Sequence, residues 1–361
     1  MVMLPRERVW QALLLLAAVG VSLYTHSIVL EKFIAPTYGN TGIHLASMRH
    51  VLEHGQYPMV DYSYGGGTAN LYVPLYRMGG ATLALLTGLD LDTVARMLVL
   101  LIAIVLPLGT FGLTRALFKS PWAAVAAAFV VSSIPELLAY TVRPLPQALG
   151  HALLMIAWYA LATKNLRLSL LMAFLVSWVH QEAAVFHAGV SFGMGLLALV
   201  GGWRSSDGVT KREYYELAKL AFLTWFVASS AYLGWHYGIA QGPHLWELSQ
   251  FKYHEGGVLE AAAALEKSGS LLPVLSALGL FALLVRQLKG PKDTSAALTL
   301  VLALLGVGLF TVKNDLVGIK VFMDRFLVYL QQAIVPLAGL GLVQIMAMVW
   351  YFVNQLLARR R

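Results

Sequence analysis

Apolar runs of about twenty residues recur along the whole chain, and they constrain its fold more than any other feature. An α-helix needs a run of this length to cross the hydrocarbon core of a bilayer. Charged residues make up 12% of the 361 residues, well below the share that soluble domains carry. The sequence therefore predicts an all-α, polytopic transmembrane helical bundle, with one membrane domain over residues 1–361 and no soluble domain.

Ten of the apolar runs have the length and composition of membrane spans. The first is too long for a typical cleaved signal peptide, and no small-residue cleavage site follows it, so we expect it to be retained. The chain has no cysteine, which excludes disulfides, thiolate metal sites and cysteine nucleophiles. The ten predicted spans are 9–30, 92–117, 121–140, 144–163, 166–181, 183–203, 215–238, 270–288, 295–312 and 326–355.

An eleventh apolar segment, 71–86, determines the topology, because every later loop changes side if it crosses. If the N-terminus is cytoplasmic and 71–86 does not cross, 16 of the 26 basic residues lie inside, against 5 of the 18 acidic residues. This asymmetry follows the positive-inside rule. We therefore expect a non-crossing external helix within a first external region, 31–91, and a second external segment, 239–269. Both termini are predicted to be cytoplasmic, in a prokaryotic plasma membrane.

The first external region opens with a polar stretch, "NTGIHLASMRHVLEHGQYP". Asn40 is a favoured helix N-cap, and Gly55 followed by Pro58 is a typical helix end, so a short helix is predicted up to His54. This helix is either a solvated loop helix or a wall of an external cavity, with Asn40 and His44 at its mouth.

The order of a first span, this polar stretch, an apolar non-crossing helix and many spans with basic cytoplasmic turns resembles the GT-C class of integral membrane glycosyltransferases. The resemblance implies transfer of a sugar from a polyprenyl-phosphate or -pyrophosphate carrier on the external face. It also implies an acidic residue in the first external loop and another near the outer start of the fourth span. The matching positions are Asn40 and Gln147, in "TVRPLPQALGH". An amide cannot act as a general base, so this would be a divergent member.

Two other carboxylates are candidates for the catalytic base. Glu182 lies in the turn "HQE" between two apolar runs, and the first of these runs is short for a span, so the turn is predicted to lie below the outer surface. An ionisable residue at membrane depth is costly and is by default functional. His180 in the same turn is a predicted substrate-binding residue, and Asp61 in the first external region is the second candidate base. The alternative is that the turn reaches the lipid headgroups.

Three further residues are predicted to bind substrate. The resemblance implies that Arg325, in "MDRFLVY", faces the phosphate of the carrier, and Arg143 lies at another outer helix end; both could instead snorkel to the interface. Trp246 in the second external segment suits either a sugar ring or the headgroup belt. No residue spacing specifies a metal site, and a divalent cation such as Mg²⁺ or Mn²⁺ stays open as a cofactor that the resemblance implies.

These observations favour a GT-C-like glycosyltransferase whose partners are membrane lipid and a polyprenyl-phosphate sugar donor. No motif indicates binding of nucleic acid. One alternative is a non-catalytic relative that presents a lipid-linked glycan or serves as a subunit of a membrane protein complex. A second alternative is a transporter. The transporter is less favoured, because the ionisable residues gather at the outer ends of the spans and not near the midplane.

Overall fold

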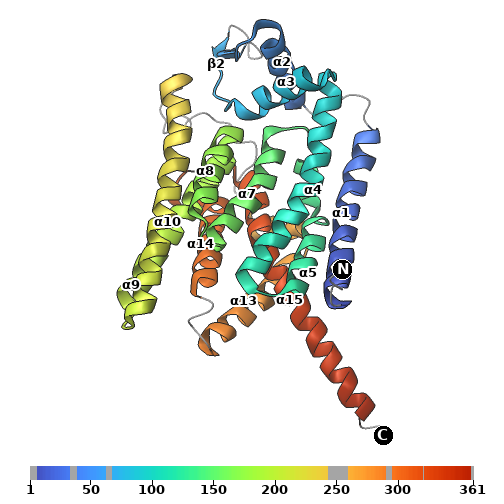
Figure 1. The fold of residues 1–361 in the computed structure, drawn as a ribbon, viewed down its shortest axis with the longest axis vertical. Coiled ribbons are helices and arrows are strands. Elements are labelled where there is room, and N and C mark those ends of the chain that lie inside the picture. The colour runs from blue at the N-terminus through green and yellow to red at the C-terminus, as the bar shows by residue number, and fades with distance from the viewer. Residues whose placement is uncertain are drawn as a thin grey trace, which may run out of the picture.

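The computed structural model describes residues 6–32, 39–61, 67–242, 259–289, 295–319 and 321–358. Figure 1 shows a bundle of roughly parallel helices with a smaller unit at one end. The bundle is built from α1 (Arg6–Lys32), α4 (Leu91–Phe118), α5 (Pro121–Val131), α6 (Pro135–Thr141), α7 (Pro146–Ala162), α8 (Leu166–Val179), α9 (Gln181–Arg204), α10 (Gly208–Leu233) with the π-helix η2 (Gly234–Ile239), α13 (Leu271–Lys289), α14 (Ser295–Val312) and α15 (Met323–Ala358).

The predicted spans are helical in the described part of the chain, apart from a break within 121–140, but not every one is long enough to cross a membrane alone. Six helices of the described residues are long and apolar enough, or seven if a bent pair counts as one span. The helices α8 and α14 are apolar but shorter. The transmembrane helical fold is therefore confirmed, whereas the predicted number of about ten spans is not.

The bent pair corrects the continuous helix that was predicted over 121–140. The helices α5 and α6 meet at an angle of 69° across a short break. Pro135 is the first residue of α6, where its missing N–H costs nothing, but it could not continue α5 because its ring would clash with the preceding turn. The break places α6 beside α7.

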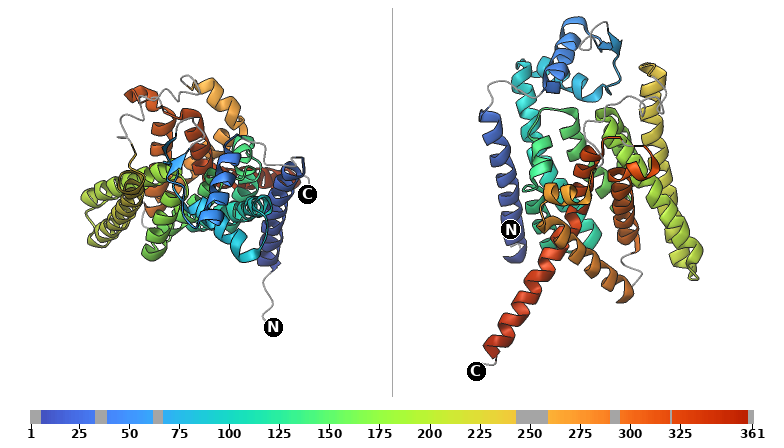
Figure 2. Two further views of the ribbon diagram at one scale, coloured as in Figure 1. Left: turned by 90° about the horizontal axis from the view of Figure 1, so that it is seen from above. Right: turned by 180° about the vertical axis from the view of Figure 1, so that it is seen from behind.

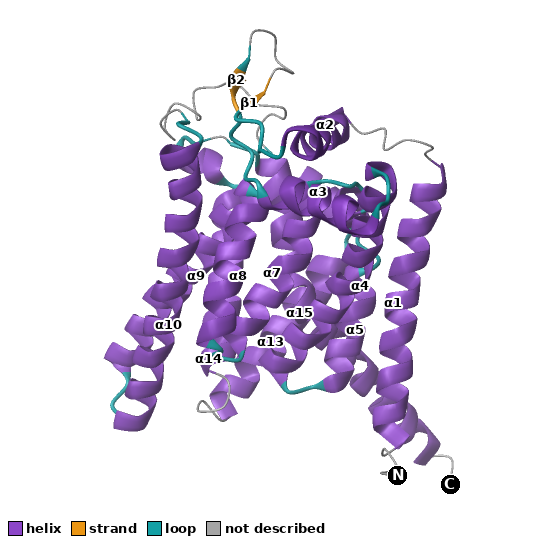
Figure 3. Ribbon diagram, turned by 45° about the horizontal axis from the view of Figure 1, so that its top comes forward, coloured by secondary structure: helices purple, strands orange, loops and turns teal. Residues whose placement is uncertain are grey.

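The unit at the end of the bundle consists of α2 (Gly39–His54), the short antiparallel strands β1 (Val60–Asp61) and β2 (Thr68–Ala69), and α3 (Leu75–Thr87). Figure 3 shows α3 lying across the ends of the bundle helices, which confirms that 71–86 does not cross. Two further short helices of the described chain are α12 (Ala261–Ser268) and the 3₁₀-helix η4 (Asn314–Val317). We call the segment 39–87 the external unit, and the end of the bundle beside it the outer end, after the side of the membrane on which the sequence predicts them.

The helix α2 ends at His54 and Gly55 follows with a positive φ of 68°, as predicted. It begins at Gly39, however, so Asn40 lies inside the first turn and is not the cap. Helix ends shift by a residue or two because their terminal backbone groups have few bonds within the helix. Both chain termini lie at the end of the bundle opposite the external unit (Figures 1 and 2).

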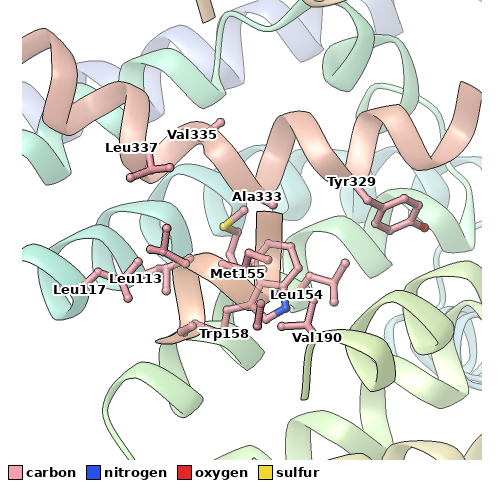
Figure 4. Packing of buried hydrophobic residues seen from close by; sticks show 14 of the residues in the cluster. Leu113, Leu117, Leu154, Met155, Trp158, Val190, Tyr329, Ala333, Val335 and Leu337 are labelled. Atoms are coloured by element: carbon pink, nitrogen blue, oxygen red, sulfur yellow. The ribbon is translucent and has the colours of Figure 1, made fainter. Parts of the chain in front are cut away.

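The main core forms around α7 and α15, where Leu154, Met155, Trp158 and Tyr329 are almost completely buried (Figure 4). Glycines let α15 approach α13 closely: a Cβ atom on Gly341 would meet the carbonyl oxygen of Leu275 on α13. Contact of this kind between helix backbones is typical of helix packing in membranes. The packing fixes α15, whose outer end carries Arg325.

Candidate functional site

The candidate site forms where α8 ends and α9 begins. His180 has an extended backbone and is at once the residue after α8 and the N-cap of α9, so Glu182 falls in the first turn of α9. A helix N-terminus favours negative charge there. The helix α8 has 14 residues. At a rise of about 1.5 Å per residue, it spans roughly 21 Å, less than the hydrocarbon thickness. Glu182 is buried, with 4% of its surface exposed.

Two helices bring a charged group and an amide onto the Glu182 carboxylate of α9. Arg325 of α15 donates from Nη1 to Oε1 at 2.8 Å, and Gln147 of α7 donates from Nε2 to Oε2 at 3.3 Å. The Arg325 side chain stays 34% exposed, whereas that of Glu182 is 4% exposed. The pair is therefore a buried anion held by a cation that still has a face open to a second anion.

A second group of hydrogen-bonded polar residues, from α7, α15 and the end of α8, supports this pair. The hydroxyl of Tyr329 lies 3.2 Å from Nδ1 of His180. Gln332, one turn further along α15, bonds His151 of α7 twice, at 2.7 Å to its ring and 2.6 Å to its carbonyl oxygen. The rings of His151 and Tyr329 are 4.4 Å apart. These contacts lock α7, α8 and α15 in one register, which fixes the positions of Glu182 and Arg325.

Aromatic side chains surround the Arg325 guanidinium. Its Cζ atom lies 4.7 Å from the ring centre of Phe322, within the range of a cation–π contact. The hydroxyls of Tyr140 on α6 and Tyr72 in the external unit are electrostatic neighbours of Arg325. Tyr72 of the external unit therefore lies close enough to Arg325 to interact with its charge.

The centre of the external unit is Arg77 of α3, which is completely buried. Its Nε donates to Nδ1 of His44 at 2.9 Å, and its Nη1 donates to the hydroxyl of Tyr57 at 2.9 Å and to Oδ1 of Asn70 at 3.0 Å. Burial holds the pKa of His44 well below its usual range, and the charges of Arg77 and His180 lower it further. His44 is thus a neutral ring between the external unit and the site.

The structure places the other predicted residues as follows. Asn40 is exposed in the first turn of α2, whereas His44, one turn later, is buried. Asp61 lies on β1, near the hydroxyl of Tyr57. Arg143 follows α6 and stacks on Tyr140, with 5.6 Å between Cζ and the ring centre. Trp246 lies outside the described residues, as does most of the second external segment.

Sequence reasoning missed Arg77, Tyr72, Tyr329 and the pair of His151 and Gln332. One signal for Arg77 was available, because it is the single charged residue of the apolar segment 71–86. An ionisable residue in such a segment is a functional candidate by default. Tyr329 and Gln332 follow Arg325 at helical spacing, so they share its face of α15, but nothing in the sequence pairs that face with α7.

The residues at this site do not fit a divalent cation. Within the described ranges, no three His, Asp or Glu side chains come together as ligands. Both oxygens of Glu182 already accept hydrogen bonds, and one of the donors is a guanidinium 2.8 Å away, where a cation would have to bind. Divalent cations in oxygen sites are held by several carboxylate or carbonyl oxygens.

Comparisons with known proteins add evidence on the fold. No protein-family model and no curated protein matches the sequence. Among solved structures, the oligosaccharyltransferase AglB from Archaeoglobus fulgidus, in complex with an inhibitory peptide and a dolichol-phosphate, superposes with a TM-score of 0.68 at 12% identity, over 98% of this chain. A second A. fulgidus oligosaccharyltransferase structure, a complex with Zn and sulfate, has a TM-score of 0.59 at 14% identity, over 96% of this chain.

The chain spans only about half the length of these structures, 52% and 51% respectively. Identities this low establish the fold and not the activity. The fold predicted from the order of spans and external helices is confirmed: the chain is an integral membrane protein with a GT-C-like fold, similar to that of the archaeal oligosaccharyltransferase AglB.

Proposed function

We propose that this protein is a GT-C-like glycosyltransferase, which moves a sugar from a polyprenyl-phosphate carrier to an acceptor on the external face of the membrane. The observation that carries the proposal is the Glu182–Arg325 pair at the covered end of the bundle. Arg325 uses one N–H group for Glu182, and its side chain is 34% exposed, so other N–H groups can bind phosphate oxygens. The likeness to AglB, solved with dolichol-phosphate, supports a lipid-linked donor.

In the transfer step, the oxygen of the acceptor hydroxyl forms a bond to the anomeric carbon of the sugar. The bond from that carbon to the carrier phosphate breaks, and its electron pair stays on the phosphate oxygen, which gains negative charge. Arg325 stabilises this charge, because its fixed positive charge lies beside the Glu182 carboxylate and its other N–H groups can reach the phosphate. The acceptor proton passes to a base. Phosphate is a good leaving group, so a base and a fixed positive charge suffice without a covalent intermediate.

Glu182 is the proposed base, and Asp61 is the second candidate. Each carboxylate oxygen has two lone pairs, so Glu182 can accept a proton while it keeps Arg325 and Gln147 as partners. Arg325 has a second role in this scheme, because it holds the carboxylate in one orientation toward the sugar. Asp61 lies on β1 beside Tyr57 and would act only if the acceptor enters from the external unit.

The test is transfer of labelled sugar in nanodiscs that contain the full chain and synthetic polyprenyl-phosphate hexoses or pentoses. Glu182→Gln keeps the shape of the side chain and should abolish transfer, and Arg325→Gln should lower it by about a hundredfold or more, as loss of one charge-stabilising donor does. Glu53→Gln and Arg49→Gln, on the exposed face of α2, are the matched controls and should leave transfer unchanged. Undiminished turnover in Glu182→Gln would refute its role as the base.

One observation favours a second candidate function, a non-catalytic relative that binds or presents a lipid-linked glycan. Gln147 places a neutral amide on Glu182, where the resemblance implies a second carboxylate. In that case the nanodiscs would retain polyprenyl phosphate, and Arg325→Gln would release it, yet no sugar would be transferred from any donor. Binding and transfer measured on the same preparation therefore separate the two functions.

A further inference from the structure

Arg77 is an unusual residue to bury, because its charge has no acidic partner among the residues that the structure describes. Its side chain is completely inaccessible, and its three hydrogen-bond acceptors within the described chain are an imidazole, a hydroxyl and an amide oxygen. None of the ion pairs of the described residues includes it. Burying a guanidinium without a carboxylate is costly, and a well-packed apolar side chain would serve stability better. The residue must therefore do something that an apolar side chain cannot.

What it does is join three separate segments. One acceptor, His44, lies 33 residues earlier on α2; a second, Tyr57, lies in the segment after α2; the third, Asn70, follows β2. The guanidinium also stacks on Tyr72, with Cζ 4.5 Å from the ring centre. Only a planar fork with several N–H groups can reach acceptors in these directions at once. A lysine would have the same charge, but all of its N–H donors would be on a single nitrogen atom.

The bonds of Arg77 fix the protonation state of His44. A guanidinium only donates, so Nδ1 of His44 must accept and the ring must be neutral, with its proton on Nε2. The hydroxyl of Tyr57, the second acceptor, donates in turn to the carbonyl oxygen of Tyr72 at 2.9 Å. The donors and acceptors thus form one connected set, in which each group determines the orientation of the next.

This set connects the external unit to the bundle at the site. Tyr57 packs edge-on against Trp235 of η2 with 5.5 Å between ring centres, and Trp235 donates to the carbonyl oxygen of Leu71 at 3.3 Å. His44 is an electrostatic neighbour of His180, and Tyr72 is one of Arg325. Two residues that Arg77 contacts therefore lie near the site, His44 close to His180 and Tyr72 close to Arg325.

We propose that Arg77 is a positioning residue, whose fork fixes His44 and Tyr72 as the outer wall of the donor site. It touches neither the sugar nor the phosphate, and it acts through the two residues that it orients. The proposal rests on the proposed function for the identity of the donor, but not for the placement of the external unit. Loss of the fork should let the external unit move on the bundle, so the donor should bind more weakly while bound donor still reacts.

The first measurement does not depend on activity. The chain has no cysteine, so two introduced cysteines carry spin labels without further changes. Labels at Glu53, exposed on α2, and at Val317, which is 57% exposed at the end of η4, report the position of the external unit on the bundle. In nanodiscs we expect one narrow distance distribution for the doubly labelled chain that keeps Arg77, and the same for the control variant Arg49→Met. We expect a broad distribution for Arg77→Met and Arg77→Lys. An unchanged width in Arg77→Met would overturn the proposal, and so would wild-type behaviour of Arg77→Lys, because charge alone would then suffice.

The second measurement separates positioning from a loss of folding. In the transfer assay the KM for the polyprenyl-phosphate sugar should rise about tenfold or more in Arg77→Lys, with a smaller change in kcat. The hydrogen bonds that this variant loses come from a charged group and orient the wall of the donor site, but they do not touch the reacting atoms. If Arg77→Met does not fold, Tyr57→Phe removes a single hydroxyl and should still broaden the distance distribution; a narrow distribution in this variant would count against the proposal. If the distance distribution broadens in the Arg77 variants but the wild-type chain transfers no sugar, the proposed function is refuted. The role of Arg77 in placing the external unit would then still hold.

Discussion

The most direct test of the site is a double-mutant cycle on Glu182 and Arg325, because the unequal exposure of the two side chains predicts unequal costs. Removing one partner of a buried ion pair costs about 3–5 kcal/mol, mainly because the other charge is left buried. Arg325→Gln leaves a carboxylate that is 4% exposed with only Gln147 as partner, whereas Glu182→Gln leaves a guanidinium that is 34% exposed and can be hydrated.

After allowance for solvent screening, we expect the free energy of unfolding to fall by about 2–3 kcal/mol in Arg325→Gln and by about 1 kcal/mol in Glu182→Gln. The double variant has no buried charge and should lose about 1 kcal/mol, which gives a coupling of about 2–3 kcal/mol. The assay is equilibrium unfolding in mixed detergent micelles, in which the free energy of unfolding is followed by circular dichroism.

The chain offers a matched control for this cycle. Lys267 and Asp324 form an ion pair at the same end of the bundle, at 3.4 Å, with side chains that are 39% and 36% exposed. The same cycle with Lys267→Gln and Asp324→Asn should give a coupling below about 0.5 kcal/mol. A coupling between Glu182 and Arg325 no larger than this, or a greater loss in Glu182→Gln than in Arg325→Gln, would refute the argument from burial.

Three further predictions concern pH, packing and topology. Burial, and to a smaller extent the charges of Arg77 and His180, holds the pKa of His44 well below its usual range. At acid pH the unfolded chain therefore binds a proton that the folded chain does not bind. The unfolding temperature should therefore fall as the pH drops below about 6.5, and His44→Gln should flatten that slope; parallel curves for the two proteins would contradict this. Gly341→Val would push a side chain into the backbone of α13 and should lower the yield of folded protein far more than Gly306→Val, a glycine with open space around it, and equal yields would argue against the close contact. Single cysteines at Glu53 and Arg212 should react differently with a membrane-impermeant maleimide on intact cells, with labelling at Glu53 only; labelling at Arg212 would reverse the predicted orientation.

Much of the fold could be predicted from the sequence, because membrane insertion depends on local composition. A run of apolar residues must become a helix in lipid, since its backbone groups have no other partners there. The distribution of basic residues also predicted the non-crossing helix over 71–86, and Gly55 with Pro58 predicted the end of α2. The break before Pro135 was missed, although the proline was visible, because a proline can kink a helix as well as end it.

The sequence by itself determined that the chain is a helical membrane bundle with an external unit, and which few polar residues lie near its outer end. Only the tertiary structure decided which of them meet. Glu182 and Arg325 are 143 residues apart, and Gln147 and Glu182 are 35 apart. Their contacts depend on how α7, α9 and α15 pack, and that packing rests on glycine contacts and buried aromatics, whose partners no local pattern specifies. The same is true of Arg77: its sequence position shows a charge in an apolar helix, and only the fold shows the three neutral groups that hold it.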